Sequence, residues 1–236
     1  MKLTVANNKK EFSRLLAAEI AGQLREKKSS VIALASGTTP KEAYAILAHQ
    51  SANGKTDFGR AHFLQLDEYL GVGREDAFAN YFEKHIIHKF GFQKERTFMF
   101  DSSGAAKKQA MRAEKFVKAK GIDLVVLGIG NNGHIAFNEP GSAFNSRTRA
   151  VKLSKATLAA NKKNFSGKQP TKAITLGIGT IIGAKKIVLA AFGEKKAKAL
   201  KGAFLERPST KVPASALQKH KNVTLIVDKK AGKFFA

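Results

Sequence analysis

Short apolar runs rich in β-branched residues alternate with longer amphipathic segments from near the start of the chain to near its end. Such runs suit strands that are covered on both faces, which is the situation in a parallel sheet. The segments between them place apolar residues three and four apart, as amphipathic helices do. We expect strands at 31–35, 62–66, 123–127, 173–176, 187–191 and 223–227, and helices at 10–28, 39–49, 77–90, 104–120, 154–165 and 194–206. This order predicts an open, doubly wound α/β fold in which helices cover both faces of a mostly parallel sheet.

The length of the chain and the absence of internal boundaries predict a single domain. The 236 residues are enough to bury a sizeable core, and no internal repeat, low-complexity tract or Pro/Gly/Ser-rich linker divides them. The polar stretch 161–171 carries several lysines, a glycine and a proline, which is typical of a mobile connection. We therefore expect one domain over 1–236 with a mobile lid around 150–172.

The cellular compartment is also constrained by the sequence. No apolar run approaches the ~20 residues that span a bilayer, and the first residues turn polar too soon for a signal peptide. The chain contains no cysteine, which excludes disulfides and thiol chemistry. We expect a cytoplasmic protein without a membrane partner.

The net charge of +24, from 42 basic and 18 acidic residues, first suggests a polyanionic partner. The lysines, however, are scattered in ones and twos through helix-like segments and do not form a block. We expect no specific nucleic-acid partner. The alternative, a nucleic-acid-binding surface beside another activity, predicts retention on DNA or RNA that falls steeply with rising salt.

The turn after the first strong strand has the composition of an anion site. It reads Ser36-Gly37-Thr38-Thr39 and is followed by Pro40. We expect Thr39 to be the N-cap of the next helix, Pro40 its first residue and Glu42 the partner of Thr39 in a capping box. Backbone N–H groups and hydroxyls at such a helix N-terminus favour a phosphate. The alternative is an ordinary capped start of a helix.

Two adjacent acids, Asp67 and Glu68, directly follow the second expected strand. Neighbouring side chains of an extended chain point to opposite sides, so one acid can face a cleft while surrounding groups hold the other. A carboxylate in a cleft at this edge is placed to take a proton from carbon. The alternative is a solvated strand end.

The segment Gly128–Pro140 contains Gly-x-Gly-x-x-Gly after a strand, which also occurs in dinucleotide-binding proteins. We reject that interpretation because the acidic residue expected about 20 positions later is absent, where the chain reads Val-Lys-Leu-Ser over 151–154. The glycines instead let the backbone approach a substrate and expose His134 on a tight turn. Asn132 and Glu139 flank this histidine and can fix its tautomer and basicity. A purely structural histidine is the alternative.

Several segments together resemble the family of glucosamine-6-phosphate deaminases (isomerising), in the family's order and over essentially the whole chain. The matching segments are 35–40, 66–71, 128–140, 146–149 and 213–218. The resemblance implies a Rossmann-like fold and a reaction without cofactor or metal, in which glucosamine 6-phosphate and water give fructose 6-phosphate and ammonia. We expect a small sugar phosphate as the substrate and a monomer or small homo-oligomer.

The resemblance also implies roles for individual residues. Asp67 is expected to move the proton between C2 and C1 of the sugar, and His134 to assist opening of the pyranose ring. Glu139 is expected to orient His134, with Asn132 beside them. The phosphate is expected to bind to Ser36, Gly37, Thr38, Thr39, Lys163 and Lys196.

Three positions depart from the family's pattern. Many members carry an aspartate at the position of Asn132. An asparagine can hydrogen-bond His134 but cannot share its proton, so the transfer of protons to and from His134 would depend on Glu139 alone. Lys163 stands where arginine is usual and keeps the charge without the bidentate fork. Val151 replaces a basic residue that binds the activator in allosteric members, which predicts a non-allosteric enzyme.

Other functions stay open at this point. A 6-phosphogluconolactonase would share the fold, the phosphate turn and a Gly-x-Gly-x-x-Gly-His segment, although its relatives usually continue that segment differently from Ile135–Pro140. A deaminase specific for the galacto epimer would carry the same motifs. The amide at Asn132 also permits a catalytically inactive sensor of sugar phosphates, which ammonia release would exclude.

Overall fold

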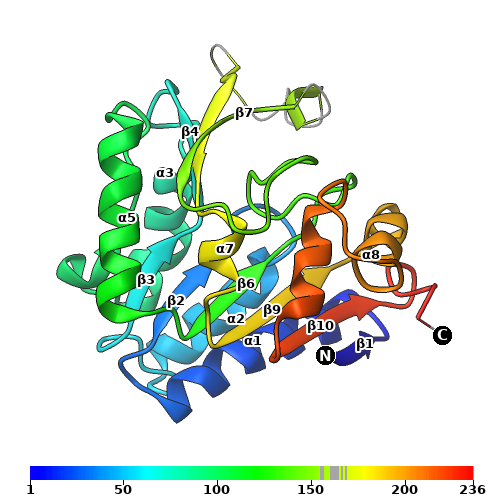
Figure 1. Ribbon diagram of the computed structural model, residues 1–236. Coiled ribbons are helices and arrows are strands. Elements are labelled where there is room, and N and C mark those ends of the chain that lie inside the picture. Colours follow the sequence, from blue (N-terminus) through cyan, green and yellow to red (C-terminus); the bar gives the residue numbers. More distant parts are fainter. Residues whose placement is uncertain (155–156, 160–164, 166, 168, 236) are drawn as a thin grey trace.

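The computed structural model describes residues 1–154, 157–159, 165, 167 and 169–235. Its main element is a parallel sheet with the strand order β1-β10-β9-β6-β2-β3-β5 (Figure 1). The strands are β1 (Lys2–Ala6), β2 (Val31–Leu34), β3 (His62–Gln65), β5 (Thr97–Phe98), β6 (Leu124–Leu127), β9 (Lys186–Ala191) and β10 (Val223–Asp228). This confirms the expected α/β fold with a mostly parallel open sheet.

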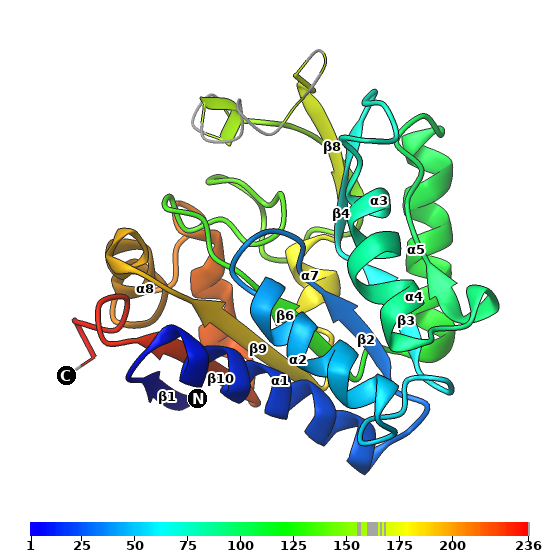
Figure 2. The same cartoon turned by 180° about the vertical axis from the view of Figure 1, so that it is seen from behind.

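Helices cover both faces of this sheet, with α1 and α2 on one side and α5, α7 and α8 on the other (Figures 1 and 2). The helices are α1 (Lys9–Glu26), α2 (Lys41–Ala52), α3 (Phe78–Phe82), α4 (His88–Phe90), α5 (Ala106–Lys120), α7 (Ile178–Ile181) and α8 (Ala197–Phe204). A π-helical turn, Glu83–Ile87, joins α3 to α4, and 3-10 turns form at Lys94–Arg96, Glu194–Lys196 and Pro213–Lys219. Within the described residues, no helix has the length and apolar character needed to cross a membrane.

The strands supply side chains to two separate apolar cores. In β6, Leu124 and Val126 pack into the core under α1 and α2, whereas Val125 and Leu127 pack into the core under α5, α7 and α8. This alternation follows from the two-residue period of a strand. It explains why the strands of this sheet are hydrophobic at consecutive positions.

A second, three-stranded antiparallel sheet was not expected from the sequence. Its order is β4-β8-β7, formed by β4 (Asp67–Leu70), β8 (Lys172–Thr175) and β7 (Arg149–Lys152). The prediction that the run 173–176 joins the parallel sheet is therefore wrong: hydrophobicity indicated a strand there, but not the strand that it pairs with. An aromatic cluster, in which Tyr69 of β4 contacts Phe78 and Phe137, lies beside this sheet.

The helix predicted over 154–165 falls largely, and the lid around 150–172 falls partly, on residues outside the described part of the chain. The strands β7 and β8, which precede and follow this segment in the sequence, pair with each other. The lid therefore stays a prediction.

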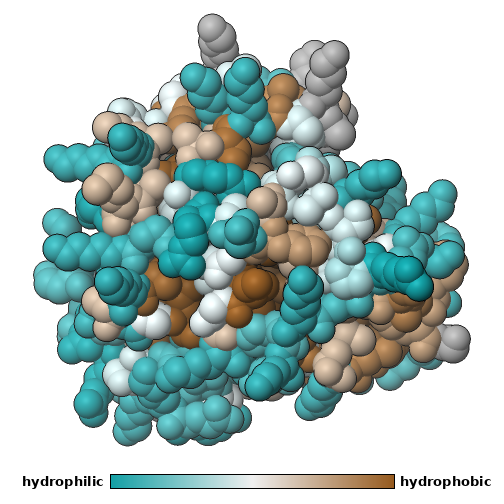
Figure 3. Space-filling model, in the orientation of Figure 1, coloured by the Kyte–Doolittle hydropathy of each residue, from teal (hydrophilic) through white to brown (hydrophobic). Residues whose placement is uncertain are grey.

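Hydrophilic residues cover most of the face seen in Figure 3, and apolar residues show mainly in its hollows and beside α8 near the C-terminus. The large apolar side chains that are exposed near that end are Leu205 and Phe234, at 49% and 38%. Lys201 and Lys233 lie over the ring of Phe234, so their aliphatic and charged groups partly cover it.

Candidate active site

A cavity of about 530 Å³ opens beyond the carboxyl ends of β2 and β6. The chain runs outward from β2 to β3 and β5 on one side and from β6 to β9 and β10 on the other, so the strand order reverses between β2 and β6. Ligands of open α/β sheets bind at such a reversal. The turns that follow these two strands, together with the start of β4, supply most of the cavity wall.

The turn Ser36-Gly37-Thr38-Thr39 lines the cavity, as expected for an anion site. Gly37 has a φ of 95°, in the left-handed region that favours glycine. The predicted capping box is wrong. The helix α2 begins at Lys41 with Pro40 at the N-cap position, in a helical conformation and without a side-chain cap. Glu42 instead accepts a hydrogen bond from the Ser13 hydroxyl of α1 at 3.1 Å. The side chain of Thr39 does not cap α2, and the residue lines the cavity.

Lys196 lines the same cavity from the side of β9, the strand next to β6. It ends the 3-10 turn Glu194–Lys196 that follows β9. Burial lowers its pKa, because a charged ammonium loses hydration there. No acceptor among the described residues is paired with its ammonium, which leaves its donors to a ligand. Lys163, the other lysine expected at the phosphate, lies outside the described residues.

Asp67 lines the cavity at the point where the chain leaves the main sheet and begins β4. It is only 8% exposed. Burial, and secondly the charge of Glu68, raise the pKa of Asp67 to about 8. A carboxylate with this pKa is a much stronger base near neutral pH than an ordinary aspartate.

Glu68 is fully buried and points away from the cavity, into a cage of donors. The donors to its carboxylate are the Gln65 side chain at 3.0 Å and the backbone N–H groups of Tyr69, Phe78 and Ala79 at 2.8, 2.8 and 2.7 Å. Two of these N–H groups belong to the first turn of α3, where a carboxylate is favoured. The adjacent acids therefore divide as expected, with one facing the cavity and one held by its neighbours.

His134 faces the cavity and lies against Glu139. Its Nδ1 is 3.6 Å from Oε2 of Glu139, within ion-pair distance. A Cβ atom at Gly130 would lie 2.3 Å from the imidazole, so only glycine leaves room for the ring. Burial disfavours the charge of Glu139, but interactions with His134, Thr157 and Asn132 outweigh it and hold the pKa of Glu139 at about 2.

Asn132 contacts the backbone of His134 and the side chain of Glu139. Its Oδ1 accepts from the N–H of His134 at 3.2 Å, and its Nδ2 donates to Oε2 of Glu139 at 2.9 Å. The expected bond from Asn132 to His134 thus forms with the main chain. Because an ionised aspartate has no donor, only the amide can bond an ionised Glu139 in this geometry.

No local pattern marked Thr157 as a site residue, because it lies in a segment predicted as an ordinary helix. Its hydroxyl donates to Oε1 of Glu139, and the residue lines the cavity. It connects the segment after β7 with the carboxylate that supports His134. Only long-range packing brings these two residues together, so local patterns could not reveal it.

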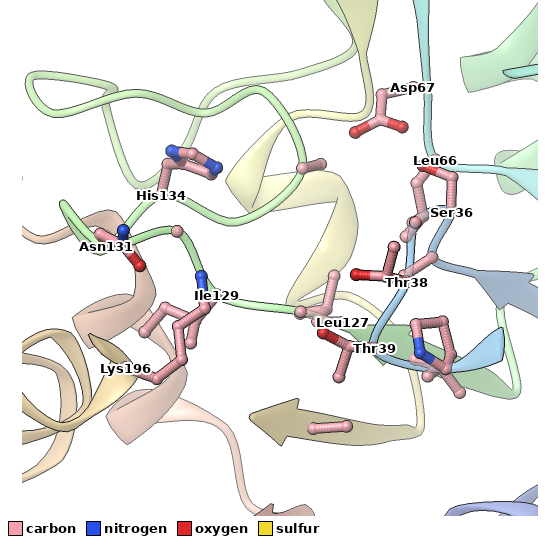
Figure 4. A pocket seen from close by; sticks show the side chains of 18 of the residues that line it. Ser36, Thr38, Thr39, Leu66, Asp67, Leu127, Ile129, Asn131, His134 and Lys196 are labelled. Atoms are coloured by element: carbon pink, nitrogen blue, oxygen red, sulfur yellow. The ribbon is translucent and has the colours of Figure 1, made fainter. Parts of the chain in front are cut away.

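The cavity has two chemically different ends. Figure 4 shows Asp67 and His134 on opposite sides of its upper part, with Thr38, Thr39 and Lys196 below them in that view. Among the described residues, no group of three or more acidic or histidine side chains gathers as metal ligands. An acid and a base at one end and anion-binding groups at the other are features of α/β enzymes that act on small anionic molecules.

The chain belongs to the family of glucosamine-6-phosphate isomerases and 6-phosphogluconolactonases, whose family model matches residues 6–226. It is 38% identical over 237 residues to a glucosamine-6-phosphate deaminase of Thermoanaerobacter sp. (strain X514), covering 98% of this chain and 94% of that protein. The solved structure of a monomeric glucosamine-6-phosphate deaminase matches with a TM-score of 0.94 at 33% identity and covers 99% of both chains. A 6-phosphogluconolactonase from Trypanosoma brucei, with a TM-score of 0.78 at 23% identity and coverage of 100% and 98%, shares the fold.

Proposed function

We propose that this protein is a glucosamine-6-phosphate deaminase that converts glucosamine 6-phosphate and water to fructose 6-phosphate and ammonia. The observation that carries the proposal is the single cavity that Asp67 and His134 share with the turn Ser36–Thr39 and Lys196. The full-length similarity to deaminases supports it.

In this proposal Asp67 moves one proton within the open-chain substrate. Its carboxylate takes the proton from C2 and returns it to C1, while the aldehyde oxygen takes one proton from the substrate ammonium; C1 becomes an alcohol carbon and C2 an iminium. Water adds at C2 and ammonia leaves, so the atoms of substrate and water are all accounted for. The protonated amine of the substrate acidifies C2 and also favours the ionised form of Asp67 beside it.

His134 opens the sugar ring in the same proposal. An imidazole can donate a proton to the ring oxygen and take the proton of the C1 hydroxyl. Glu139, with its pKa held at about 2, stays ionised throughout the working range and stabilises the imidazolium. Binding of the phosphate at the other end orients the reacting carbons without taking part in the chemistry.

The direct test is a coupled assay for fructose 6-phosphate and ammonium, run with glucosamine 6-phosphate, its galacto epimer and 6-phosphogluconolactone. We expect turnover of glucosamine 6-phosphate with equal yields of the two products. Turnover of the lactone alone would show that the protein is a lactonase, and turnover of the galacto epimer alone would show that its substrate is galactosamine 6-phosphate. Binding of sugar phosphate without ammonia release would indicate a sensor.

Replacing Lys196 by methionine should raise KM for glucosamine 6-phosphate about 10- to 100-fold, the usual effect of losing a hydrogen bond between charged groups. The phosphate would lose its ammonium partner in a partly dehydrated cavity, whereas kcat should change little. The control is Lys195→Met, because Lys195 is its exposed neighbour on the same turn. Equal kinetics for the two variants would remove Lys196 from the phosphate site.

The kinetics should be hyperbolic, as expected for a non-allosteric enzyme. Val151 lines a second cavity, of about 400 Å³, and packs against the aromatic cluster beside β4. Arg149 in the same cavity is engaged by Asn138 and Ser142 at 3.0 and 3.2 Å. Initial rates measured with and without N-acetylglucosamine 6-phosphate check this. Sigmoidal rates that this compound makes hyperbolic would contradict the prediction.

The cytoplasmic location and the assembly as a monomer or small homo-oligomer stay predictions. The solved relative described as monomeric makes a monomer the state that we propose first.

A further inference from the structure

Three side-chain donors from three different helices bond alternate carbonyl groups of the turn after β2. The donors come from α1, α2 and α3, and none of them lines the cavity that the turn itself lines. The pairs are Tyr44 hydroxyl with the Ala35 carbonyl at 2.8 Å, Tyr81 hydroxyl with the Gly37 carbonyl at 3.0 Å, and Lys9 ammonium with the Thr39 carbonyl at 3.0 Å. These three carbonyl oxygens are therefore held toward the helices, on the side away from the cavity.

The direction of these carbonyls fixes the direction of the N–H groups that follow them. In a trans peptide the C=O and N–H bonds point in opposite directions, and the chain has no cis peptide bonds in its described part. Holding the carbonyls of Ala35 and Gly37 outward thus turns the N–H groups of Ser36 and Thr38 toward the cavity. The carbonyl of Thr39 precedes Pro40, which has no N–H, so bonding it only keeps a negative dipole away from an anion.

The N–H groups of the turn are available to a ligand. In the described part of the chain, no acceptor is bonded to the backbone N–H of Ser36, Gly37, Thr38 or Thr39. Successive N–H groups that face one concavity attract an anion, whereas a carbonyl in the same place would repel it. The hydrogen bonds to the Ala35 and Gly37 carbonyls therefore favour an orientation of the turn in which its N–H groups can receive an anion.

Two of the outer donors also connect the turn to other parts of the site. Tyr81 lies on α3, whose first N–H groups bond Glu68, the neighbour of Asp67. The ammonium of Lys9 lies 4.7 Å from the ring centroid of Phe192, which comes just before the turn that carries Lys196. Each donor thus lies between the turn and a segment next to a further group of the site.

We propose that Tyr81 and Lys9 are positioning residues that hold the turn Ser36–Thr39 in the conformation that binds the substrate phosphate. The identity of the ligand as a sugar phosphate rests on the proposed function. The orientation of the N–H groups toward an anion does not depend on the reaction.

The test combines Tyr81→Phe, Lys9→Met and the double variant, with inorganic phosphate as the probe. We expect each single variant to raise the dissociation constant of phosphate, measured by calorimetry, by about three- to tenfold, which corresponds to one lost hydrogen bond. KM for glucosamine 6-phosphate should rise by a similar factor, while kcat stays within about twofold because the reacting carbons lie elsewhere. Lys9→Arg, which keeps a donor and the charge, should restore most of the affinity.

Matched controls separate positioning from other effects. Lys10→Met removes the same charge from the exposed neighbour of Lys9, and Tyr69→Phe removes a hydroxyl that does not bond the turn. Both controls should leave the phosphate affinity unchanged. Because Tyr81→Phe alters no charge, weaker binding in that variant cannot come from long-range attraction.

Two outcomes would overturn the inference. One is unchanged phosphate affinity in Tyr81→Phe and Lys9→Met, even with a lower melting temperature, since the contacts would then be only structural. The other is a fall in kcat with unchanged KM. If the unmodified protein releases no ammonia from glucosamine 6-phosphate, the proposed function fails, but the calorimetric comparison still decides the role of the two residues.

Discussion

Asp67→Asn is expected to lower kcat about 10²- to 10⁴-fold, the range that a general base contributes, while KM changes little. The amide keeps the size of the side chain but cannot take the proton from C2. Exchange of that proton with solvent, followed by NMR in deuterium oxide, should disappear together with ammonia release. Retained exchange in the variant would remove Asp67 from the mechanism.

The pH dependence follows from the same group. Asp67 must be ionised to act as a base, and its pKa in the folded protein is raised to about 8. We therefore expect kcat/KM of the unmodified enzyme to fall as the pH is lowered through about 8, since kcat/KM reports the free enzyme. An acid limb near pH 4 would show that Asp67 is an ordinary solvated carboxylate.

The same substitution should stabilise the fold in alkaline solution. The pKa of Asp67 is raised from 3.8 to about 8 by folding, so ionisation opposes folding. The stability that the protonated carboxyl of Asp67 contributes is fully present below pH 3.8, the pKa in the unfolded chain. It is lost as the pH rises to about 8, so the free energy of unfolding falls over this range. Asp67→Asn should thus gain up to a few kcal/mol over the unmodified protein at pH 8.5, since one pKa unit is worth about 1.4 kcal/mol.

Denaturant unfolding at several pH values measures this gain. The matched control is Asp57→Asn, because Asp57 is exposed and caps a turn through one N–H bond, from Gly59 at 2.8 Å. Its effect on stability should not grow between pH 5 and pH 8.5. A base that weakens the fold that carries it is a common feature of active sites.

The sequence alone located the turns of the site because of one property of parallel sheets. The carboxyl ends of the strands meet at one edge, so residues that follow different strands come together. This brought Asp67, His134 and the turn Ser36–Thr39 to one cavity, as expected. The resemblance to the deaminase family, and not the spacing, suggested the individual roles of these residues.

Features that depend on long-range packing were not predictable from local patterns. Lys196 resembles many other lysines in the sequence, so it was expected only from the resemblance to the family, and its burial in the cavity is what distinguishes it physically. The second sheet arose from pairing between β4 and β8, which local hydrophobicity does not encode. Tyr81 and Lys9 bond the turn from positions 44 and 30 residues away, and no local motif marks such a contact.

The second large effect is expected at His134. His134→Gln should lower kcat/KM for glucosamine 6-phosphate by about 10²-fold or more, because glutamine can hydrogen-bond but cannot transfer a proton near neutral pH. Glu139 lies 3.6 Å from Nδ1 and stays ionised, so it supports the imidazolium that ring opening requires. The loss should be much smaller with an analogue that lacks the 5-hydroxyl, since that compound cannot close the pyranose ring.

Steady-state kinetics with both compounds make the comparison, and the control is His88→Gln, since His88 is exposed on α4 and does not line the cavity. The control should match the unmodified enzyme with both compounds. If His134→Gln loses the same factor with the ring-forming substrate and with the analogue, the imidazole serves proton transfer at C2 or departure of ammonia. If the loss occurs only with the ring-forming substrate, the two residues act in separate steps. His134 then opens the sugar ring on one side of the cavity, and Asp67, on the other side, acts on the open-chain sugar afterwards.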